Sequence, residues 1–336
     1  MSQKEEFIDR LMRLMSKPHF ANLWAWSLGA VLLYAPPAYA QASRSVAQPN
    51  AKVSVSSPQK QSEDPQRVLQ RLAIADVVYL GETHDSADDH RAQLEIIQSL
   101  YRLRPDLAIA MEMFQRPYQS VLDRYLAGAI TETQLKELSQ YQTRWGFEWE
   151  YYAPILRFAK ENRLRVIAVN TPTEVTRKVS REGLESLTVA DRRFIPPISE
   201  IRAEPEVYRE RMRLIYQEIH QGKSNSRQFD RFFLAQILWD ETMADRVSQF
   251  LQANPKTQVV VLAGQGHIVY GDGIPSRVAR RMQGAKRRSR VQSLILLNPP
   301  EEVTAPSERT IADYFWNYQS SSSPVLEPDR LRPKSR

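Results

Sequence analysis

The sequence of 336 residues contains no cysteine. This absence excludes disulfide bonds, zinc sites built on thiolates, cysteine nucleophiles and a lipid attached through cysteine. A chain of this length can bury enough apolar surface to fold without such cross-links. We therefore expect a domain that is held together by its core alone.

Long apolar runs are also scarce, and the one clear example lies near the N-terminus at Ala21–Ala35. Basic residues precede it, and the A-x-A pattern of Ala38–Ala40 follows it, as in a secretory signal peptide. The run is shorter than the ~20 residues that span a bilayer. We predict a signal peptide at residues 1–40, cleaved after Ala40. The mature protein would then be exported to the periplasm, without a transmembrane segment, and would not be a lipoprotein.

Basic residues only mildly outnumber acidic ones. The formal net charge is +7, and it falls to about +6 when residues 1–40 are removed. The densest basic run, Arg281–Arg290, contains no aromatic residue and is typical of a solvated turn. The composition therefore argues against nucleic acid as a partner.

The chain between two polar segments alternates apolar runs with amphipathic stretches. Residues 41–66 are rich in Ser, Gln and Pro and indicate a flexible linker, and residues 319–336 indicate a polar tail. Between them, residues 67–318 predict one α/β domain with a mostly parallel β-sheet flanked by helices. Residues 204–253 contain no strand pattern and indicate a helical insert or cap. The predicted strands are Val77–Leu80, Leu107–Met111, Arg165–Val169, Gln258–Leu262 and Val291–Leu297.

Polar side chains follow these strands where the strands end. Glu82 and His84 follow the first, Glu112 follows the second, and His267 follows the fourth. Ligands of parallel sheets bind at the carboxyl ends of the strands, so we expect these four side chains to lie together. Two imidazoles and two carboxylates can ligate a divalent metal, or they can form an acid–base set for hydrolysis. Each residue alone is explained by capping, whereas the four together favour a functional site.

Several neighbouring residues have simpler interpretations. His84 precedes a helix predicted at residues 86–101, whose positive end favours a neutral imidazole. His90 is expected on the solvated face of that helix. Asp240 falls on an apolar stripe, where it either pairs with a cation such as Arg116 or Arg246 or lines a pocket. Of these two readings we favour pairing.

Aromatic residues are concentrated in one stretch. Core packing explains much of this cluster, but two adjacent tyrosines cannot both face inward, so one is expected at a pocket mouth or an interface. The cluster consists of Trp145, Phe147, Trp149, Tyr151 and Tyr152.

Three blocks of sequence carry a resemblance to a known family: VVYLGETHDSADDH, AIAMEMFQRPYQSVLDRYLAG and VVVLAGQGHIVYGDGIPSR. They resemble the ChaN haem-binding uptake proteins, which form a superfamily with Tiki proteases, TraB and erythromycin esterases. The resemblance spans roughly Val68 to Leu297. The superfamily shares a GExH motif, a second Glu and a late His. The corresponding residues of this chain are Glu82, His84, Glu112 and His267.

The resemblance implies that haem is the bound cofactor and that the protein serves haem or iron uptake. It further implies a homodimer enclosing the haem, and outer-membrane uptake machinery as a partner. Haem needs an axial ligand within apolar walls. The candidate ligands are Tyr151, Tyr152 and Tyr270, with Arg116 as a further haem-binding candidate.

The alternative function is hydrolysis of an ester or peptide bond, either metal-dependent or based on His and Glu. Glu82, His84, Glu112 and His267 are then the catalytic residues, or the ligands of a divalent metal. A scaffold that keeps the cluster only for folding is the third hypothesis.

Overall fold

The computed structural model describes residues 52–59, 61–203, 205–220, 225–283, 291–299 and 309–319. The predicted signal peptide lies outside these residues, as does the predicted tail beyond residue 319. Within the described part of the chain, no helix combines the length and the apolar character needed to cross a bilayer.

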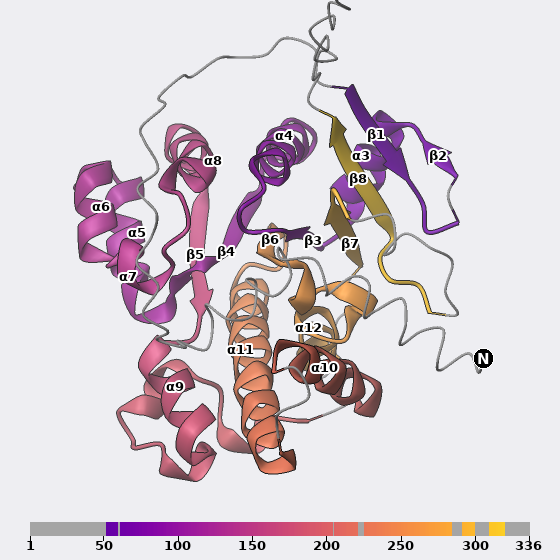
Figure 1. The fold of residues 1–336 in the computed structure, drawn as a ribbon. Helices are drawn as coiled ribbons and strands as arrows, with labels where there is room; N and C mark the ends of the chain where they lie inside the picture. Colours follow the sequence, from indigo (N-terminus) through magenta and orange to yellow (C-terminus); the bar gives the residue numbers. More distant parts are fainter. Residues whose placement is uncertain are drawn as a thin grey trace, which may run out of the picture.

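The centre of the fold is an eight-stranded sheet with the order β2-β1-β8-β7-β3-β6-β4-β5 (Figure 1). The strands from β8 to β5 pair in parallel, whereas β1 pairs antiparallel with both β2 and β8. The α/β class and the mostly parallel sheet are thus confirmed. The strands are β1 (Lys52–Ser56), β2 (Ser62–Glu63), β3 (Val77–Glu82), β4 (Leu107–Gln115), β5 (Arg165–Asn170), β6 (Gln258–Gly264), β7 (Gln292–Leu297) and β8 (Tyr314–Gln319).

The central strands are apolar on both faces because helices cover both faces. Every residue of β3, β4 and β6 is buried. On β3, Val78 and Leu80 join one core cluster, while Val77 and Tyr79 join the other. This alternation follows from the period of two residues in a strand.

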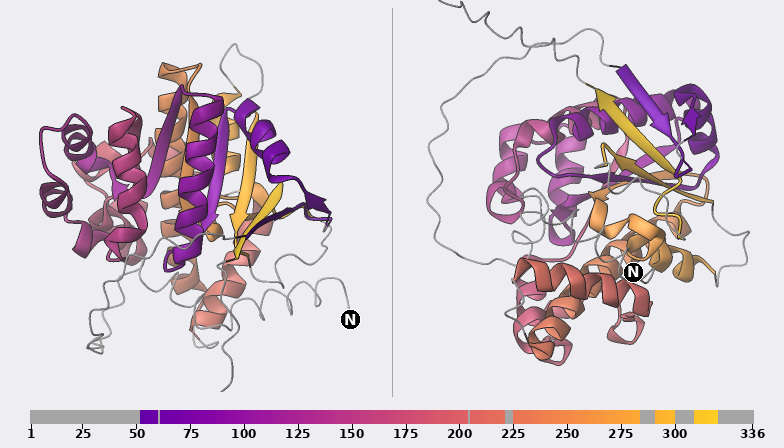
Figure 2. Two further views of the ribbon diagram at one scale, coloured as in Figure 1. Left: turned by 90° about the horizontal axis from the view of Figure 1, so that it is seen from above. Right: turned by 45° about the vertical axis from the view of Figure 1, so that its right-hand side comes forward.

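Two layers of helices enclose the sheet (Figures 1 and 2). Helices α3, α4, α5 and α8 contribute to the first core cluster, and α11 and α12 to the second. The helices are α3 (Pro65–Ile74), α4 (Ala87–Leu103), α5 (Gln119–Leu126), α6 (Glu132–Leu138), α7 (Tyr141–Arg144), α8 (Trp149–Glu161), α9 (Thr173–Glu182), α10 (Glu206–Ile219), α11 (Ser226–Ala253) and α12 (Ile274–Met282).

Part of the expected linker is instead regular structure. Strands β1 and β2 and the start of α3 fall within residues 41–66. The segment Lys52–Ser56 alternates polar and apolar residues, and Val55 is buried in the first core cluster. Its partner β8 lies more than 250 residues away in the sequence, so no local pattern predicts the pairing.

The expected helical insert is a layer of the domain rather than a separate cap. Helix α11 packs against β5, α9 and α12. Its residues Met243, Ala244 and Val247 are fully buried in the second core cluster. The apolar stripe along α11 therefore faces the sheet.

The outer edge of β5 is closed by one side chain. The amide of Gln119 donates through Nε2 to the Val166 carbonyl at 2.8 Å, and its Oε1 accepts from the Ala168 N–H at 2.8 Å. An unpaired strand edge is a template for association with other chains. Gln119 satisfies two backbone groups of this edge within the molecule.

Candidate functional site

Glu82 and His84 form the first part of a buried cluster at the carboxyl ends of the strands. Glu82 is the last residue of β3, and His84 lies in the turn before α4. His84 Nδ1 is 2.7 Å from Glu82 Oε1, and Glu82 is fully buried. Helix α4 begins after the N-cap Ser86, whose side chain accepts from the Asp89 N–H. This cap fixes the turn that carries His84.

Three further side chains surround the Glu82 carboxylate. The Tyr152 hydroxyl donates to Oε1 at 2.7 Å, the Gln93 amide donates to Oε2, and His90 Nδ1 lies 3.6 Å from Oε2. Burial raises the pKa of Glu82, but His90, His84 and Tyr152 lower it more strongly, so the pKa lies below its ordinary value. Glu82 is therefore held as an ion by its neighbours.

His90 is buried, and the expectation of a solvated position is wrong. Its Nε2 lies 3.1 Å from the His84 carbonyl oxygen, and its Nδ1 lies 3.2 Å from Gln93 Oε1. Its ring stacks on Tyr151 with centroids 4.7 Å apart. The first turns of α4 face α8 and the end of β3, so this face carries polar residues that serve the cluster.

Glu112 lies between the two histidines that the sequence singled out. It belongs to β4, where the register against β5 shifts between Met111 and Gln115. Such an irregularity re-aims side chains. Glu112 Oε2 accepts from the Gly264 N–H at 2.8 Å, and Glu112 Oε1 lies 3.5 Å from His267 Nε2.

Gly264 leaves room for His84 beside its backbone. A Cβ atom at this position would lie 3.0 Å from His84 Nε2 and 3.9 Å from Glu112 Oε2. The absence of a side chain thus lets His84 and Glu112 border the same point of β6.

His267 completes the cluster from the turn after β6, and its partner is Asp240 of α11. His267 Nδ1 is 2.7 Å from Asp240 Oδ1. Asp240 was expected to be a buried, paired acid, and it is, but its partner is His267 rather than Arg116 or Arg246. The stripe of α11 that faces the sheet passes under the end of β6, so Asp240 meets the imidazole there.

The environment favours protonated imidazoles. Burial lowers the pKa of His84, but the hydrogen bond to Glu82 and the charges of Glu112 and Glu82 outweigh it, so the pKa is raised. Burial likewise lowers the pKa of His267, and the charges of Glu112 and Asp240 raise it by more. The carboxylates of neighbouring elements thus act against the helix end, which was expected to favour a neutral His84.

Metal binding by Glu82, His84, Glu112 and His267 stays a prediction. Among the residues that the structure describes, no group of three or more His, Asp or Glu side chains is arranged to hold a metal ion. Both oxygens of Glu82 accept hydrogen bonds, and the Nδ1 atoms of His84 and His267 each face a carboxylate. These contacts fit acid–base chemistry and metal binding alike, because a metal-ligating histidine usually donates its other ring nitrogen to a carboxylate.

The three tyrosines proposed as haem ligands occupy different places. Tyr152 is fully buried, and its hydroxyl is committed to Glu82, which speaks against an axial role. Tyr151 is partly buried and stacks on His90. Tyr270 is partly buried, with the guanidinium carbons of Arg211 and Arg309 5.0 and 5.1 Å from its ring centroid.

Two aromatic side chains lie beside His84. The ring centroids of Trp145 and Phe147 are 4.8 and 5.0 Å from the centroid of the His84 ring. Both are partly buried, as is Tyr151. We call Trp145, Phe147 and Tyr151 the aromatic ledge. Of the two adjacent tyrosines, Tyr152 faces inward and Tyr151 is only partly buried.

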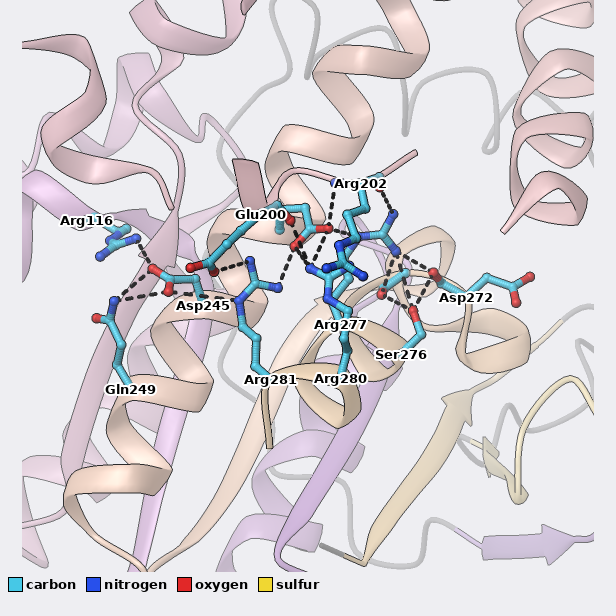
Figure 3. A network of polar contacts seen from close by, with 12 residues as sticks. Arg116, Glu200, Arg202, Asp245, Gln249, Asp272, Ser276, Arg277, Arg280 and Arg281 are labelled. Atoms are coloured by element: carbon cyan, nitrogen blue, oxygen red, sulfur yellow. Dashed lines mark hydrogen bonds and ion pairs between the residues drawn. The ribbon is translucent and has the colours of Figure 1, made fainter. Parts of the chain in front are cut away.

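Arg116 lies in a separate network of ion pairs between α11 and α12 (Figure 3). Its Nη1 is 2.9 Å from Asp245 Oδ2, and burial lowers its pKa against the opposing charge of Asp245. Glu241, which is fully buried, is the centre of the same network. Arginines of α12 bind Glu241: Arg277, Arg280 and Arg281. The guanidinium of Arg116 therefore serves helix packing.

Comparison with known proteins decides the family. The family model for haem-binding uptake proteins, Tiki superfamily, ChaN, matches residues 68–278. This chain belongs to the ChaN family. The match includes Glu82, His84, Glu112 and His267.

Two solved structures are similar to this chain to different degrees. The structure described as cofacial heme binding to ChaN of Campylobacter jejuni is 17% identical in sequence with a TM-score of 0.63, and the match covers 80% of this chain and 97% of that chain. At this identity the likeness shows a common fold. An erythromycin esterase mutant in its open conformation is 15% identical with a TM-score of 0.43, over 73% of this chain and 76% of that chain.

A curated relative comes from a plant. The Arabidopsis thaliana protein RETICULATA-RELATED 5, chloroplastic, is 28% identical over 277 residues, which are 77% of this chain and 36% of that protein. The chain thus spans about a third of the length of this relative.

Three residues of the buried cluster were not assigned to it from the sequence: His90, Gln93 and Asp240. Gln93 lies three residues after His90 on α4, and it shares the buried face with Ile96 and Ile97. A polar pair at the start of an otherwise apolar helix face is a signal that could have placed both near the strand ends. For Asp240 the signal was its position on the apolar stripe of α11.

Proposed function

We propose that this chain binds haem as its cargo. The observation that carries the proposal is the ChaN family match over residues 68–278. The ChaN protein of Campylobacter jejuni, which shares the fold, is described as binding heme cofacially. Because family membership alone does not place a ligand, the residues must also fit one.

The aromatic ledge fits a flat apolar ligand. Trp145 and Phe147 offer ring surfaces beside His84, and Tyr151 offers one beside His90. A haem pocket consists of apolar walls with one donor for the iron. The Tyr151 phenol is a donor of the required type. Haem, when bound, supplies the iron centre that such a phenol ligates.

Tyr270 is the competing ligand, and charge favours it. Burial raises the pKa of Tyr270, while Arg211 and Arg309 oppose this by favouring the phenolate. For Tyr151, burial and the charges of Asp85 and Glu148 all raise the pKa. Apolar surroundings therefore support Tyr151, and electrostatics supports Tyr270.

Absorption titration of the full chain with hemin tests the proposal. We expect saturable binding with a shifted Soret band, and a changed spectrum in either Tyr151→Phe or Tyr270→Phe. Tyr101→Phe is a matched control, because Tyr101 is a partly buried tyrosine that packs on Phe158 of α8. A wild-type chain without a Soret shift contradicts haem binding.

We further propose that the protein is exported to the periplasm and serves haem or iron uptake, as a homodimer and with outer-membrane uptake machinery. Support for export comes from the pattern of residues 1–40, and support for uptake from the family description. The plant relative is described as chloroplastic, so the family does not imply one compartment. Cell fractionation with N-terminal sequencing tests export, with Gln41 expected as the first residue. Light scattering with and without hemin tests the dimer.

Acid–base hydrolysis of an ester or peptide bond is the second candidate function. The observation that favours it is the meeting of two carboxylate–imidazole pairs, Glu82–His84 and Asp240–His267, at Glu112. An imidazole held by one carboxylate can take a proton from water and return it to a leaving group. The second imidazole, when protonated, can stabilise negative charge on the reacting oxygen.

Turnover on a panel of esters and peptides tests this second function. We expect activity that His267→Asn abolishes. His220→Asn is the matched control, because His220 directly follows α10 and packs on Tyr216. The absence of turnover across the panel argues against hydrolysis.

A further inference from the structure

Asp240 lies between two hydrogen-bonding partners deep in the molecule. It is fully buried in the middle of α11. Its Oδ1 is 2.7 Å from His267 Nδ1, and its Oδ2 accepts from the Tyr208 hydroxyl at 2.5 Å. Each oxygen of this carboxylate thus has a partner from a different element.

The chemistry of these atoms defines the hydrogen position on His267. Both ring nitrogens of His267 face a carboxylate, but Nδ1 is within hydrogen-bonding distance of Asp240 at 2.7 Å, so the hydrogen of the neutral ring is expected on Nδ1. The other ring nitrogen, Nε2, lies 3.5 Å from Glu112 Oε1. We infer that Asp240 is a positioning residue that holds His267 with Nδ1 protonated and Nε2 turned toward Glu112. The role that this inference gives to Asp240 rests on the proposed acid–base function.

Tyr208 holds the carboxylate in this orientation. Its side chain is fully buried on α10, and burial raises its pKa well above the ordinary value, so the phenol remains a donor. The guanidinium carbons of Arg211 and Arg277 lie 5.0 and 5.4 Å from its ring centroid. With Oδ2 bound to Tyr208, the carboxylate cannot turn away from His267 without losing a buried hydrogen bond.

The surrounding backbone encloses the pair. A Cβ atom at Gly273 would lie 2.2 Å from the His267 carbonyl oxygen and 3.1 Å from Asp240 Oδ1. Glycine at the start of α12 therefore permits the contact. The amide nitrogen of Gln236, one turn before Asp240, lies 3.2 Å from the same His267 Nδ1, but the Asp240 carboxylate is the nearer partner at 2.7 Å and is expected to take the hydrogen.

The second pair repeats the geometry of the first. In both, a carboxylate meets the Nδ1 atom at 2.7 Å. Glu82 precedes its histidine by two residues, whereas Asp240 comes from α11, 27 residues before His267. Helices α10 and α11 thus contribute side chains to the site, which explains why this layer is polar at its centre.

Nitrogen-15 NMR of histidine-labelled full chain tests the inference directly. The chain has 5 histidines, so each resonance can be assigned by single replacement. At a pH where the His267 signal no longer titrates, we expect the Nδ1–H tautomer in the wild type. Asp240→Asn keeps the shape but can offer an amide donor to Nδ1, so we expect the Nε2–H tautomer. For any ester that the wild type turns over, we expect a loss of ~10²–10⁴-fold, by analogy with the Asp of a Ser-His-Asp triad.

Two controls separate positioning from general damage. Glu82→Gln is expected to change the signal of His84 and to leave the tautomer of His267 unchanged. Tyr208→Phe is expected to keep the Nδ1–H tautomer, because Asp240 Oδ1 remains in place.

Two results overturn the inference: an Nε2–H tautomer in the wild type, or an unchanged tautomer in folded Asp240→Asn. If Asp240→Asn does not fold, the wild-type spectrum alone decides. A tautomer exchange in a chain without ester or peptide turnover supports the positioning role and counts only against hydrolysis.

Discussion

His84 Nδ1 lies 2.7 Å from Glu82 Oε1, and both side chains are buried at the end of β3. The raised pKa of His84 means that its stabilising contribution is complete below its ordinary value of 6.5 and is lost as the pH rises through the folded value. The lowered pKa of Glu82 means that its contribution is present above 4.5 and is lost as the pH falls through the folded value. The pair thus stabilises the fold most between these two ordinary values.

We predict that His84→Asn removes the loss of stability that the titration of His84 causes as the pH rises. Urea denaturation at a series of pH values measures it. The free energy of unfolding of the wild type should fall more steeply above pH 6.5 than that of His84→Asn. Parallel curves for the two chains contradict the prediction.

The pH dependence of stability that Asp89 contributes should be opposite in sign to that of a carboxylate with a lowered pKa, such as Glu82. Burial raises its pKa from 3.8 to about 7, against hydrogen bonds from the Thr83 N–H, Ser86 and Asn298. The folded state then holds the proton more tightly than the unfolded chain, so this group adds stability as the pH falls below about 7. Relative to Asp89→Asn, the wild type should become more stable between pH 8 and pH 6. Asp85→Asn, at an exposed neighbour, should follow the wild type.

Gly273→Ala should destabilise the protein strongly. The added Cβ atom would lie 2.2 Å from the His267 carbonyl oxygen, which is backbone and cannot rotate away. We expect a loss of about 2–3 kcal/mol in the free energy of unfolding, or more. Gly128→Ala is the control, because nothing lies within 4 Å of its Cβ position. Its φ of +76° should still cost ~1 kcal/mol. Equal losses in the two variants would show that the contact with His267 is unimportant.

Gln119→Ala should open the edge of β5. Two backbone hydrogen bonds are lost, and each contributes ~1 kcal/mol. Gln119→Glu should be worse at neutral pH, because a carboxylate oxygen replaces the amide that donates to the Val166 carbonyl. Urea denaturation measures the stability, and light scattering measures association through the open edge. Gln142→Ala, at an exposed position of α7, should leave both measurements unchanged.

The five central strands were predicted from local pattern because a buried parallel strand must be apolar on both faces. The same pattern placed Glu82, His84, Glu112 and His267 together, since the carboxyl ends of parallel strands meet at one edge. The alternation in Lys52–Ser56 was too short to outweigh its polar surroundings, and its partner β8 is distant in sequence.

The sequence by itself therefore determined the sheet, its functional edge and the residue types gathered there, because all three follow from short-range periodicity. Only the tertiary structure decided the partners and charges of those residues. Asp240 meets His267 because α11 packs across the end of β6, and His90 is buried because α8 covers α4. The charge of His84 depends on Glu112, a carboxylate from another strand. Electrostatic energies depend on distances between elements, and folding alone sets those distances.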